Sequence, residues 1–153
     1  MNCQFGTWLI VIIGWFFVDW KNNRRELRKE KRALIDKINV DLNSIEKIAV
    51  EYHQNDHANV KTSQEIKISL DRVVKILNRE KLLIQKEYKK FIAFKQSITL
   101  ENFDSNGFIP QGDNSELLQN IYLTKDDLLH AMETKFNDDF RRDFNWFKFG
   151  RTK

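Results

Sequence analysis

The first pattern along the chain is a run of uncharged, largely apolar residues near its amino end. Residues 5–18 read FGTWLIVIIGWFFV, and extending the run to Cys3 and Trp20 adds Asp19 as the only charge. A helix of that length covers about 27 Å at about 1.5 Å per residue, slightly less than the ~30 Å hydrocarbon core of a bilayer. Because its apolar residues fall on all sides, the run predicts a transmembrane anchor over residues 1–20.

The residues around the run separate three interpretations: a signal peptide, a buried core helix and a membrane anchor. A signal peptide has basic residues before its apolar run, whereas here nothing basic precedes it and KNNRRELRKEKR follows it. Tryptophan prefers the headgroup level of a bilayer, which favours an anchor over a soluble core helix. An interfacial helix, or a helix buried in an oligomer, stays open as the alternative. We expect anchoring and assembly to depend on Trp8, Ile12, Trp15 and Trp20.

A basic juxtamembrane segment, residues 21–34, follows the anchor. The chain's net charge is +4, and residues 21–32 alone hold seven Lys/Arg against two Glu. Since loops rich in Lys and Arg stay in the cytoplasm, we expect a single-pass inner-membrane protein with its amino end outside and its carboxyl end in the cytoplasm. Anionic lipid headgroups are the expected ligands, at about 1 kcal/mol per basic residue. These residues are Lys21, Arg24, Arg25, Arg28, Lys29, Lys31 and Arg32.

Nucleic acid is a disfavoured partner for the same segment. Lysine and arginine neutralise phosphates as well as lipid headgroups, but no aromatic residue between Lys21 and Arg32 offers a stacking platform.

Long helices are expected after the anchor, because neither glycine nor proline occurs between Gly14 and Gly107. The first helix should run from about residue 4 to the low fifties. Thr62 and Glu65 have the spacing of a capping box, which predicts a second helix starting near Ser63. Heptad-spaced apolar residues mark the buried face of the first helix. They are Ile35, Ile38, Leu42, Ile45, Ala49 and Tyr52, widened by Leu34, Val40 and Ile48.

The second helix should extend for about 36 residues and form an antiparallel hairpin with the first. Glu80 and Glu87 fall on its apolar face, where they are expected to pair with lysines or to set the register. The remaining residues of that face are Leu70, Leu77, Ile84, Phe91 and Ile98, accompanied by Ile66, Val73 and Phe94.

The last part of the chain predicts a loop over residues 101–115, a short helix over 116–123 and a further helix whose start is capped by Thr124. An apolar stripe on this helix should pack on the hairpin. Its residues are Leu128, Met132, Phe136, Phe140, Phe144 and Phe147. The predicted fold is therefore all-α: a transmembrane helix continues into a long antiparallel hairpin, and a packed carboxyl-terminal helix completes a three- to four-helix bundle over residues 35–153.

No group of residues predicts catalysis, a metal site or a cofactor. His53 and His57 have a spacing that can share a metal, but the surrounding residues favour a solvated turn. His130 lacks the arginine four to six residues earlier that helical-bundle ribonucleases use. Gly-flanked serine and phosphate-binding glycine loops are also missing, and a single cysteine excludes a disulfide framework.

The basic and aromatic tail, residues 138–153, has the composition of an interfacial segment or a partner-binding end. Its candidate interface residues are Phe144, Trp146, Phe147 and Phe149.

We expect a non-enzymatic protein that self-assembles in the bacterial inner membrane, with a pore or a membrane lesion as the consequence. In layout alone, with one amino-terminal span and a small cytosolic helical bundle, the chain resembles the small membrane effectors and accessory proteins of bacterial antiphage systems, including those beside RNA-targeting CRISPR nucleases. The alternative is an anchor that recruits a cytosolic protein partner through its bundle. An RNA-binding or RNA-cleaving bundle is the third hypothesis.

Overall fold

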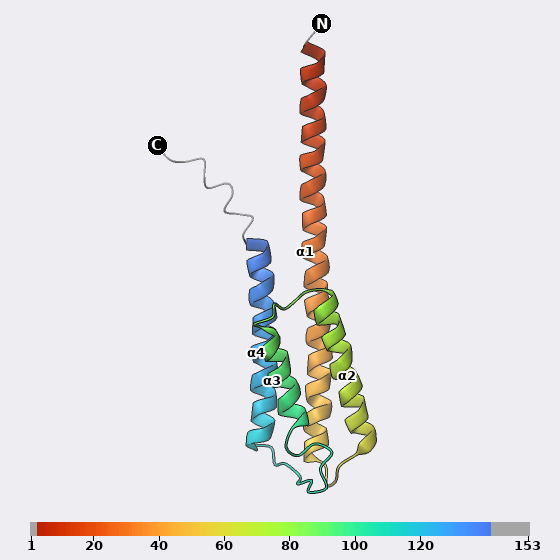
Figure 1. Ribbon diagram of the computed structural model, residues 1–153, viewed down its shortest axis with the longest axis vertical. Helices are drawn as coiled ribbons and strands as arrows, with labels where there is room; N and C mark the ends of the chain where they lie inside the picture. The colour runs from red at the N-terminus through yellow and green to blue at the C-terminus, as the bar shows by residue number, and fades with distance from the viewer. Residues whose placement is uncertain (1–2, 142–153) are drawn as a thin grey trace, which may run out of the picture. The chain divides into compact units, whose positions relative to one another are not determined.

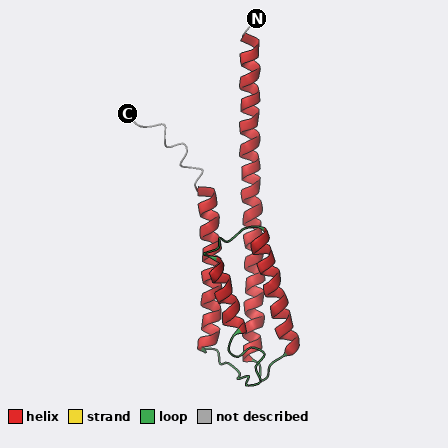
Figure 2. Ribbon diagram, in the orientation of Figure 1, coloured by secondary structure: helices red, strands yellow, loops and turns green. Residues whose placement is uncertain are grey.

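The computed structural model describes the backbone of residues 3–141 and the side chains of residue 8 and residues 11–140. Four helices and no strand occur in this part of the chain (Figures 1 and 2), which confirms the all-helical prediction. The helices are α1 (Cys3–Gln54), α2 (Val60–Arg79), α3 (Tyr88–Thr99) and α4 (Glu116–Arg141). The chain divides into two compact units, Met1–Leu34 and Ile35–Lys153.

In the second unit, consecutive helices alternate in direction (Figure 1). The end of α1, the start of α2, the end of α3 and the start of α4 all lie at the same end of this unit, where the long loop between α3 and α4 also lies. Short connections join antiparallel neighbours in such up-down bundles. The described part of the second unit is thus a four-helix bundle in which α3 is the shortest helix.

The heptad face of α1 is confirmed as the predicted core face. All six of its seam residues, Ile35, Ile38, Leu42, Ile45, Ala49 and Tyr52, are buried. Val40 does not widen this face, because its side chain is 67% exposed. Leu34 and Ile48 are half-buried.

The second helix does not run through to Ile98 as predicted, because α2 ends at Arg79. Lys81 adopts the left-handed conformation with φ 52°. Two hydrogen bonds close the end of the helix: Lys81 N donates to Asn78 O at 3.4 Å, and Leu82 N donates to Leu77 O at 3.2 Å. This pattern is a Schellman motif, and Leu82 and Leu77, at the two positions whose apolar side chains usually meet in that motif, are both buried.

Because α2 ends at Arg79, several residues predicted for the apolar face of one long second helix have other surroundings. Ile84 lies in the turn between α2 and α3 and is 49% exposed, so its predicted place in the seam is wrong. Glu80 is the C-cap residue of α2, and Glu87 precedes α3 and accepts a hydrogen bond from Ile84 N at 3.3 Å. The other seam residues are buried as predicted: Ile66, Leu70, Val73, Leu77, Phe91, Phe94 and Ile98.

Two predicted helix starts are wrong. Asn59, not the pair of Thr62 and Glu65, caps α2: its side chain accepts from Lys61 N at 3.0 Å and from Thr62 N at 3.2 Å. Thr124 caps nothing, because α4 runs without interruption from Glu116 to Arg141. Its hydroxyl donates to Asn120 O at 2.7 Å, a back-bond that a threonine inside a helix commonly makes.

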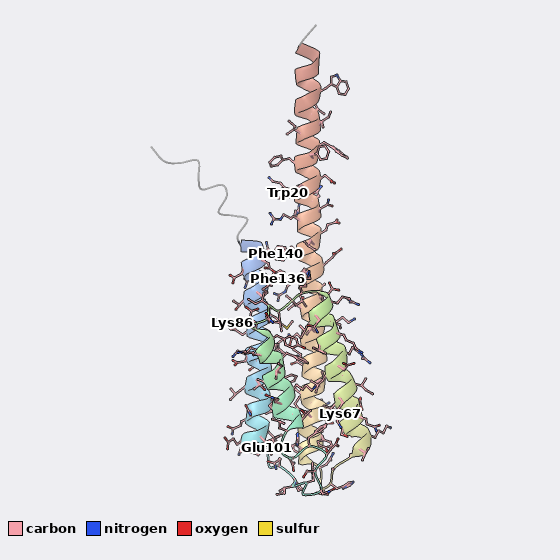
Figure 3. The ribbon with its side chains drawn as sticks, viewed as in Figure 1. Trp20, Lys67, Lys86, Glu101, Phe136 and Phe140 are labelled. Atoms are coloured by element: carbon pink, nitrogen blue, oxygen red, sulfur yellow. The ribbon has the colours of Figure 1, made fainter. Side chains whose placement is uncertain are left out.

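The apolar stripe of α4 is confirmed where the structure describes it. Leu128, Met132 and Phe136 are buried, and Phe140 is half-buried, with its ring centroid 4.9 Å from that of Phe136 (Figure 3). Phe144 and Phe147 lie outside the described residues, as do the candidate interface residues Trp146 and Phe149.

Candidate functional site

The first turns of α1 carry an exposed apolar segment, here defined as residue 8 and residues 11–20. Every side chain of this segment is exposed, and its nine large apolar side chains are 51% to 69% exposed. Exposed residues at consecutive positions of a helix point in all directions, so the whole circumference of α1 is apolar here. Soluble proteins rarely expose a continuous apolar surface of this kind unless it contacts a membrane or another protein.

Among the described residues, no helix combines the length and hydropathy needed to cross a membrane. Part of the predicted anchor, namely residues 1–2 and the side chains of residues 3–7, 9 and 10, lies outside the described residues.

The four residues expected to serve anchoring and assembly are all exposed, and helix geometry brings three of them together. At about 100° per residue, Trp8, Ile12 and Trp15 lie within an arc of about 60° on α1, whereas Trp20 lies outside it. Trp15 packs edge-on against Phe16, with ring centroids 6.2 Å apart. The three residues therefore form one ridge on the apolar segment.

Trp20 joins the apolar segment to the basic segment that follows. The guanidinium carbon of Arg24 lies 5.0 Å from the centroid of the Trp20 ring, a cation–π contact. Phe17 packs edge-on against the same ring, with centroids 6.3 Å apart. Trp20 thus has an apolar neighbour on one side and a cation on the other, the environment that tryptophan finds at the boundary between lipid and water.

The basic residues of the segment after Trp20 lie on one side of the helix, a feature that was not predicted from the sequence. Because α1 is helical throughout, its seven Lys/Arg from Lys21 to Arg32 lie within an arc of about 160°, with Glu26 and Glu30 on the opposite side. Five of the seven are exposed, and Arg24 and Lys31 are half-buried. A helix with one basic face is suited to lie against an anionic surface. The spacing of the charges in the sequence already indicates this basic face once the segment is treated as a helix.

A cluster of polar side chains that the sequence did not predict lies at the end of α1. His53 is fully buried, and its Nε2 donates to the carbonyl oxygen of Ile98 at 3.0 Å. Its Nδ1 then accepts from the Asn102 side-chain amide at 3.4 Å. Asn102 also donates to Ile109 O at 2.9 Å and accepts from Ile109 N at 2.8 Å. Burial lowers the pKa of His53, so the ring is neutral at pH 7.

Tyr52 fixes the same loop from the neighbouring position. Its hydroxyl accepts from Asp104 N at 3.0 Å and donates to Asp104 Oδ1 at 3.5 Å. Lys67 forms an ion pair with Asp104, and the hydrogen bond from its ammonium lowers the pKa of that carboxyl. Burial raises the pKa of Tyr52. Because these polar groups satisfy one another, the cluster holds the loop in place.

The histidines do not assemble a metal site. His57 is exposed beyond the end of α1, while His53 is buried and engaged at both ring nitrogens. No group of three potential ligands (His, Cys, Asp or Glu) that could hold a metal occurs among the described residues. His130 is exposed on α4.

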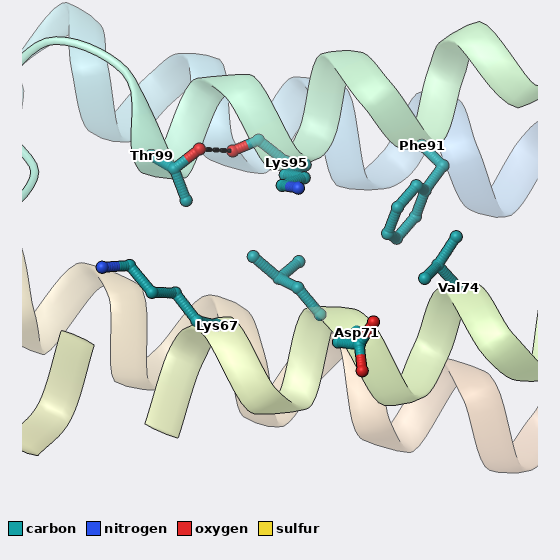
Figure 4. A pocket seen from close by; sticks show the side chains of 7 residues that line it. Lys67, Asp71, Val74, Phe91, Lys95 and Thr99 are labelled. Atoms are coloured by element: carbon teal, nitrogen blue, oxygen red, sulfur yellow. Dashed lines mark hydrogen bonds between the residues drawn. The ribbon is translucent and has the colours of Figure 1, made fainter. Parts of the chain in front are cut away.

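The bundle surface also carries shallow hollows. One of about 100 Å³ lies between α2 and α3 and is lined by Lys67, Asp71, Val74, Phe91 and Lys95, with Leu70 and Thr99 (Figure 4). Thr99 Oγ1 donates to Lys95 O at 2.9 Å, a bond within α3. Asp71 is paired with Lys75 at 2.6 Å, and Lys67 with Asp104. The hollow is small and its charges are partly matched, so it brings together no reactive pair of groups.

Comparison of the chain with protein-family models, with curated proteins and with solved structures finds no match. The exposed apolar segment and the basic segment of α1 are therefore the features of the chain that bear on its function.

Proposed function

We propose that this chain is a non-enzymatic membrane protein that works by self-assembly. The exposed apolar circumference of α1 is the observation that carries the proposal, because burying such a surface requires lipid or other copies of the same helix. In this proposal the apolar segment inserts into the bilayer and the basic face binds anionic headgroups. Trp20, stacked against Arg24, lies at the boundary between the two environments.

Orientation follows from the same charges. The excess of Lys and Arg in residues 21–32 favours a cytoplasmic position for the second unit and an outside position for the amino end, in a bacterial inner membrane. An apolar run slightly shorter than the bilayer core favours clustering or local thinning, since both reduce hydrophobic mismatch. A pore or lesion is the proposed consequence, in keeping with the layout of small antiphage membrane effectors.

The oligomeric mass of the full chain tests the proposal. The chain would be reconstituted in nanodiscs or mild detergent and weighed by mass photometry at several concentrations. We expect a discrete species of four or more subunits, followed by dye leakage from vesicles that contain anionic lipid. A monomer or dimer at every concentration would overturn self-assembly.

Topology has a separate test, because Cys3 is the only cysteine of the chain. In intact cells, a membrane-impermeant maleimide should label Cys3 from outside. As the matched control, a variant with Cys3→Ser and Asn55→Cys, placed in the exposed turn after α1, should react only after lysis. Labelling of both cysteines only after lysis would exclude the spanning orientation and favour an interfacial helix.

The second candidate function is an anchor that recruits a cytosolic protein through residues 141–153. The aromatic and basic composition of this tail favours it. Deletion of residues 141–153 separates the two functions. Loss of a co-purifying partner with unchanged oligomeric mass supports the anchor, and loss of the assembly itself supports the first proposal.

A further inference from the structure

Two helices of the bundle carry opposite net charge. α2 contains five Lys/Arg and two Asp/Glu, whereas α4 contains six Asp/Glu and three Lys/Arg. Figure 1 shows α2 and α4 on opposite flanks of the second unit, with α1 and α3 between them. The bundle therefore has a basic flank and an acidic flank.

The outward face of α2 combines basic residues with one exposed apolar residue. Ile68 lies on the side opposite the buried Leu70 and Val73 and is 60% exposed. Four basic residues lie within about 40° of Ile68 around the helix. Glu65 and Asp71 lie at the two edges of the same face, about 60° from Ile68, and all six charged residues are exposed. The four basic residues are Lys61, Arg72, Lys75 and Arg79, and together with Ile68 we call them the α2 stripe.

The outward face of α4 has the complementary composition. Leu123 lies opposite the buried Ile121 and Leu128 and is 66% exposed. Exposed polar and acidic residues continue its face along the helix. Glu116, Asp126, Asp127 and His130, together with Leu123, make up the α4 stripe.

The two stripes match in register as well as in charge. Both helices begin at the same end of the bundle and run in the same direction (Figure 1). Ile68 is the ninth residue of α2 and Leu123 the eighth residue of α4. Lys61 and Glu116 lie at the two starts, and Arg72 lies one turn beyond Ile68, as Asp126 lies one turn beyond Leu123. Parallel packing of the two helices side by side would thus place Ile68 against Leu123 and basic side chains against acidic ones.

We propose that the α2 stripe of one copy of this chain docks against the α4 stripe of the next copy. This inference rests on the proposed self-assembly and names the surface that performs it in the second unit. The occupant of each stripe is a second copy, because charge complementarity and matched register are both supplied by the chain itself. Since the two surfaces differ, the contact is heterologous and propagates into a closed ring or an open row rather than stopping at a dimer.

A charge exchange tests the contact in the full chain in nanodiscs. Arg72→Glu places like charges opposite Asp126 and should raise the concentration needed for half-assembly about tenfold. Asp126→Arg should do the same, and the double exchange should restore assembly. The control, Lys89→Glu, changes an exposed lysine of α3 outside both stripes and should leave assembly unchanged. Salt should weaken the unmodified assembly and leave the fold intact.

Cysteine cross-linking tests the heterologous geometry. In a Cys3→Ser background, the variant carrying both Ile68→Cys and Leu123→Cys should form a ladder of trimers and larger products on oxidation. Either single substitution should not, because a heterologous contact brings the two different positions together. Val40→Cys combined with Leu123→Cys is the matched control, since Val40 is 67% exposed on α1.

The possible results separate this inference from the function on which it rests. If the chain assembles but the exchanges at Arg72 and Asp126 change assembly no more than Lys89→Glu does, the α2–α4 contact is wrong and self-assembly stands. Efficient cross-linking by Ile68→Cys alone would also overturn the contact, because it indicates a symmetric dimer. A chain that stays monomeric at every concentration overturns both.

Discussion

His53 donates a hydrogen bond from Nε2 to the carbonyl oxygen of Ile98, 3.0 Å away, and so ties the end of α1 to the end of α3. With Nε2 occupied by a proton, Nδ1 is the acceptor for Asn102. The groups around the ring are uncharged, namely the Ile98 carbonyl, the Asn102 amide and the Tyr52 and Phe103 rings. A second proton on the imidazole would replace the acceptor at Nδ1 with a donor and place a charge in a buried site.

The free energy of unfolding should therefore depend on pH through His53. Burial lowers its pKa from the ordinary value of 6.5, so the native state binds fewer protons than the unfolded state. The contribution of His53 to the free energy of unfolding is fully present above pH 6.5 and is lost as the pH drops below that value. Denaturant unfolding of the full chain, followed by circular dichroism between pH 7.5 and 5, would measure this slope.

His53→Phe should remove most of the slope and cost about 1 to 3 kcal/mol at pH 7, because Asn102 and the Ile98 carbonyl lose their partner. His57→Gln and His130→Gln change exposed histidines and should retain the slope. Asp104, whose pKa is lowered by its bond to Lys67, acts in a separate range: its contribution is lost only as the pH falls below its ordinary value of 3.8. An unchanged slope in His53→Phe would contradict the assignment.

Lys81 should be a site where a single substitution stabilises the protein. Its φ of 52° is in the left-handed region, where a side chain costs about 1 kcal/mol relative to glycine. Its side chain is exposed, so its removal takes no packing from the core. Lys81→Gly should raise the free energy of unfolding by about 0.5 to 1 kcal/mol, measured by chemical denaturation. Lys86→Gly, in the same turn, is the control, and a loss of stability in Lys81→Gly would contradict the Schellman end of α2.

This turn explains why the sequence predicted one long helix in place of two. A Schellman motif is usually marked by glycine at the left-handed position, and a lysine there gives no signal. The buried face of α1 was predictable because its six residues repeat at heptad spacing within one helix. The burial of His53 was not, because its partners Ile98 and Asn102 lie 45 and 49 residues away. The helix start predicted at Thr124 was wrong for a local reason, because a threonine hydroxyl can either cap a helix or donate to a preceding carbonyl inside one.

A charge introduced at Ile84 and one introduced at Phe91 should have different effects on stability, although both residues belong to the apolar face predicted for the second helix. Phe91 is 3% exposed, so Phe91→Asp should cost more than about 3 kcal/mol by burying an unpaired charge and leaving a cavity. Ile84 lies in the exposed turn, and Ile84→Asp should cost less than about 1 kcal/mol. Thermal melting of the two variants would measure the difference, and equal destabilisation would show that α2 and α3 form one helix.

Lys125 and Glu46 form a largely buried ion pair between α4 and α1. Lys125 Nζ lies 2.7 Å from Glu46 Oε2, with the two side chains 13% and 17% exposed, and also donates to Asn43 Oδ1 at 3.0 Å. The Glu46 oxygen is buried, and its contact with the ammonium is ionic rather than a directed hydrogen bond. Lys125→Met should therefore cost about 2 kcal/mol, because it leaves a buried carboxylate without its counter-charge.

The combination of Lys125→Met with Glu46→Leu should recover most of that loss, since a well-packed apolar pair replaces a buried ion pair at little cost. The control is Lys90→Met, which breaks the ion pair of Lys90 with Asp127 on the surface and should cost less than about 0.5 kcal/mol. Urea unfolding of the unmodified chain, Lys125→Met, Glu46→Leu and the double variant would complete the cycle. Additive losses in the double variant would show that the two side chains do not interact.

The ridge formed by Trp8, Ile12 and Trp15 should matter for membrane binding and assembly while leaving the bundle unaffected. Replacing both tryptophans with alanine removes two exposed indole rings from α1, each worth about 1 to 2 kcal/mol when transferred out of water. We expect a lower bound fraction in vesicle flotation and a smaller oligomeric mass. The melting temperature of the bundle should not change, because neither ring belongs to its core. Val40→Ala combined with Ile92→Ala removes exposed apolar surface from the second unit and should leave flotation unchanged. If the two tryptophan substitutions and this control gave the same flotation, the apolar segment of α1 would have no role at the membrane.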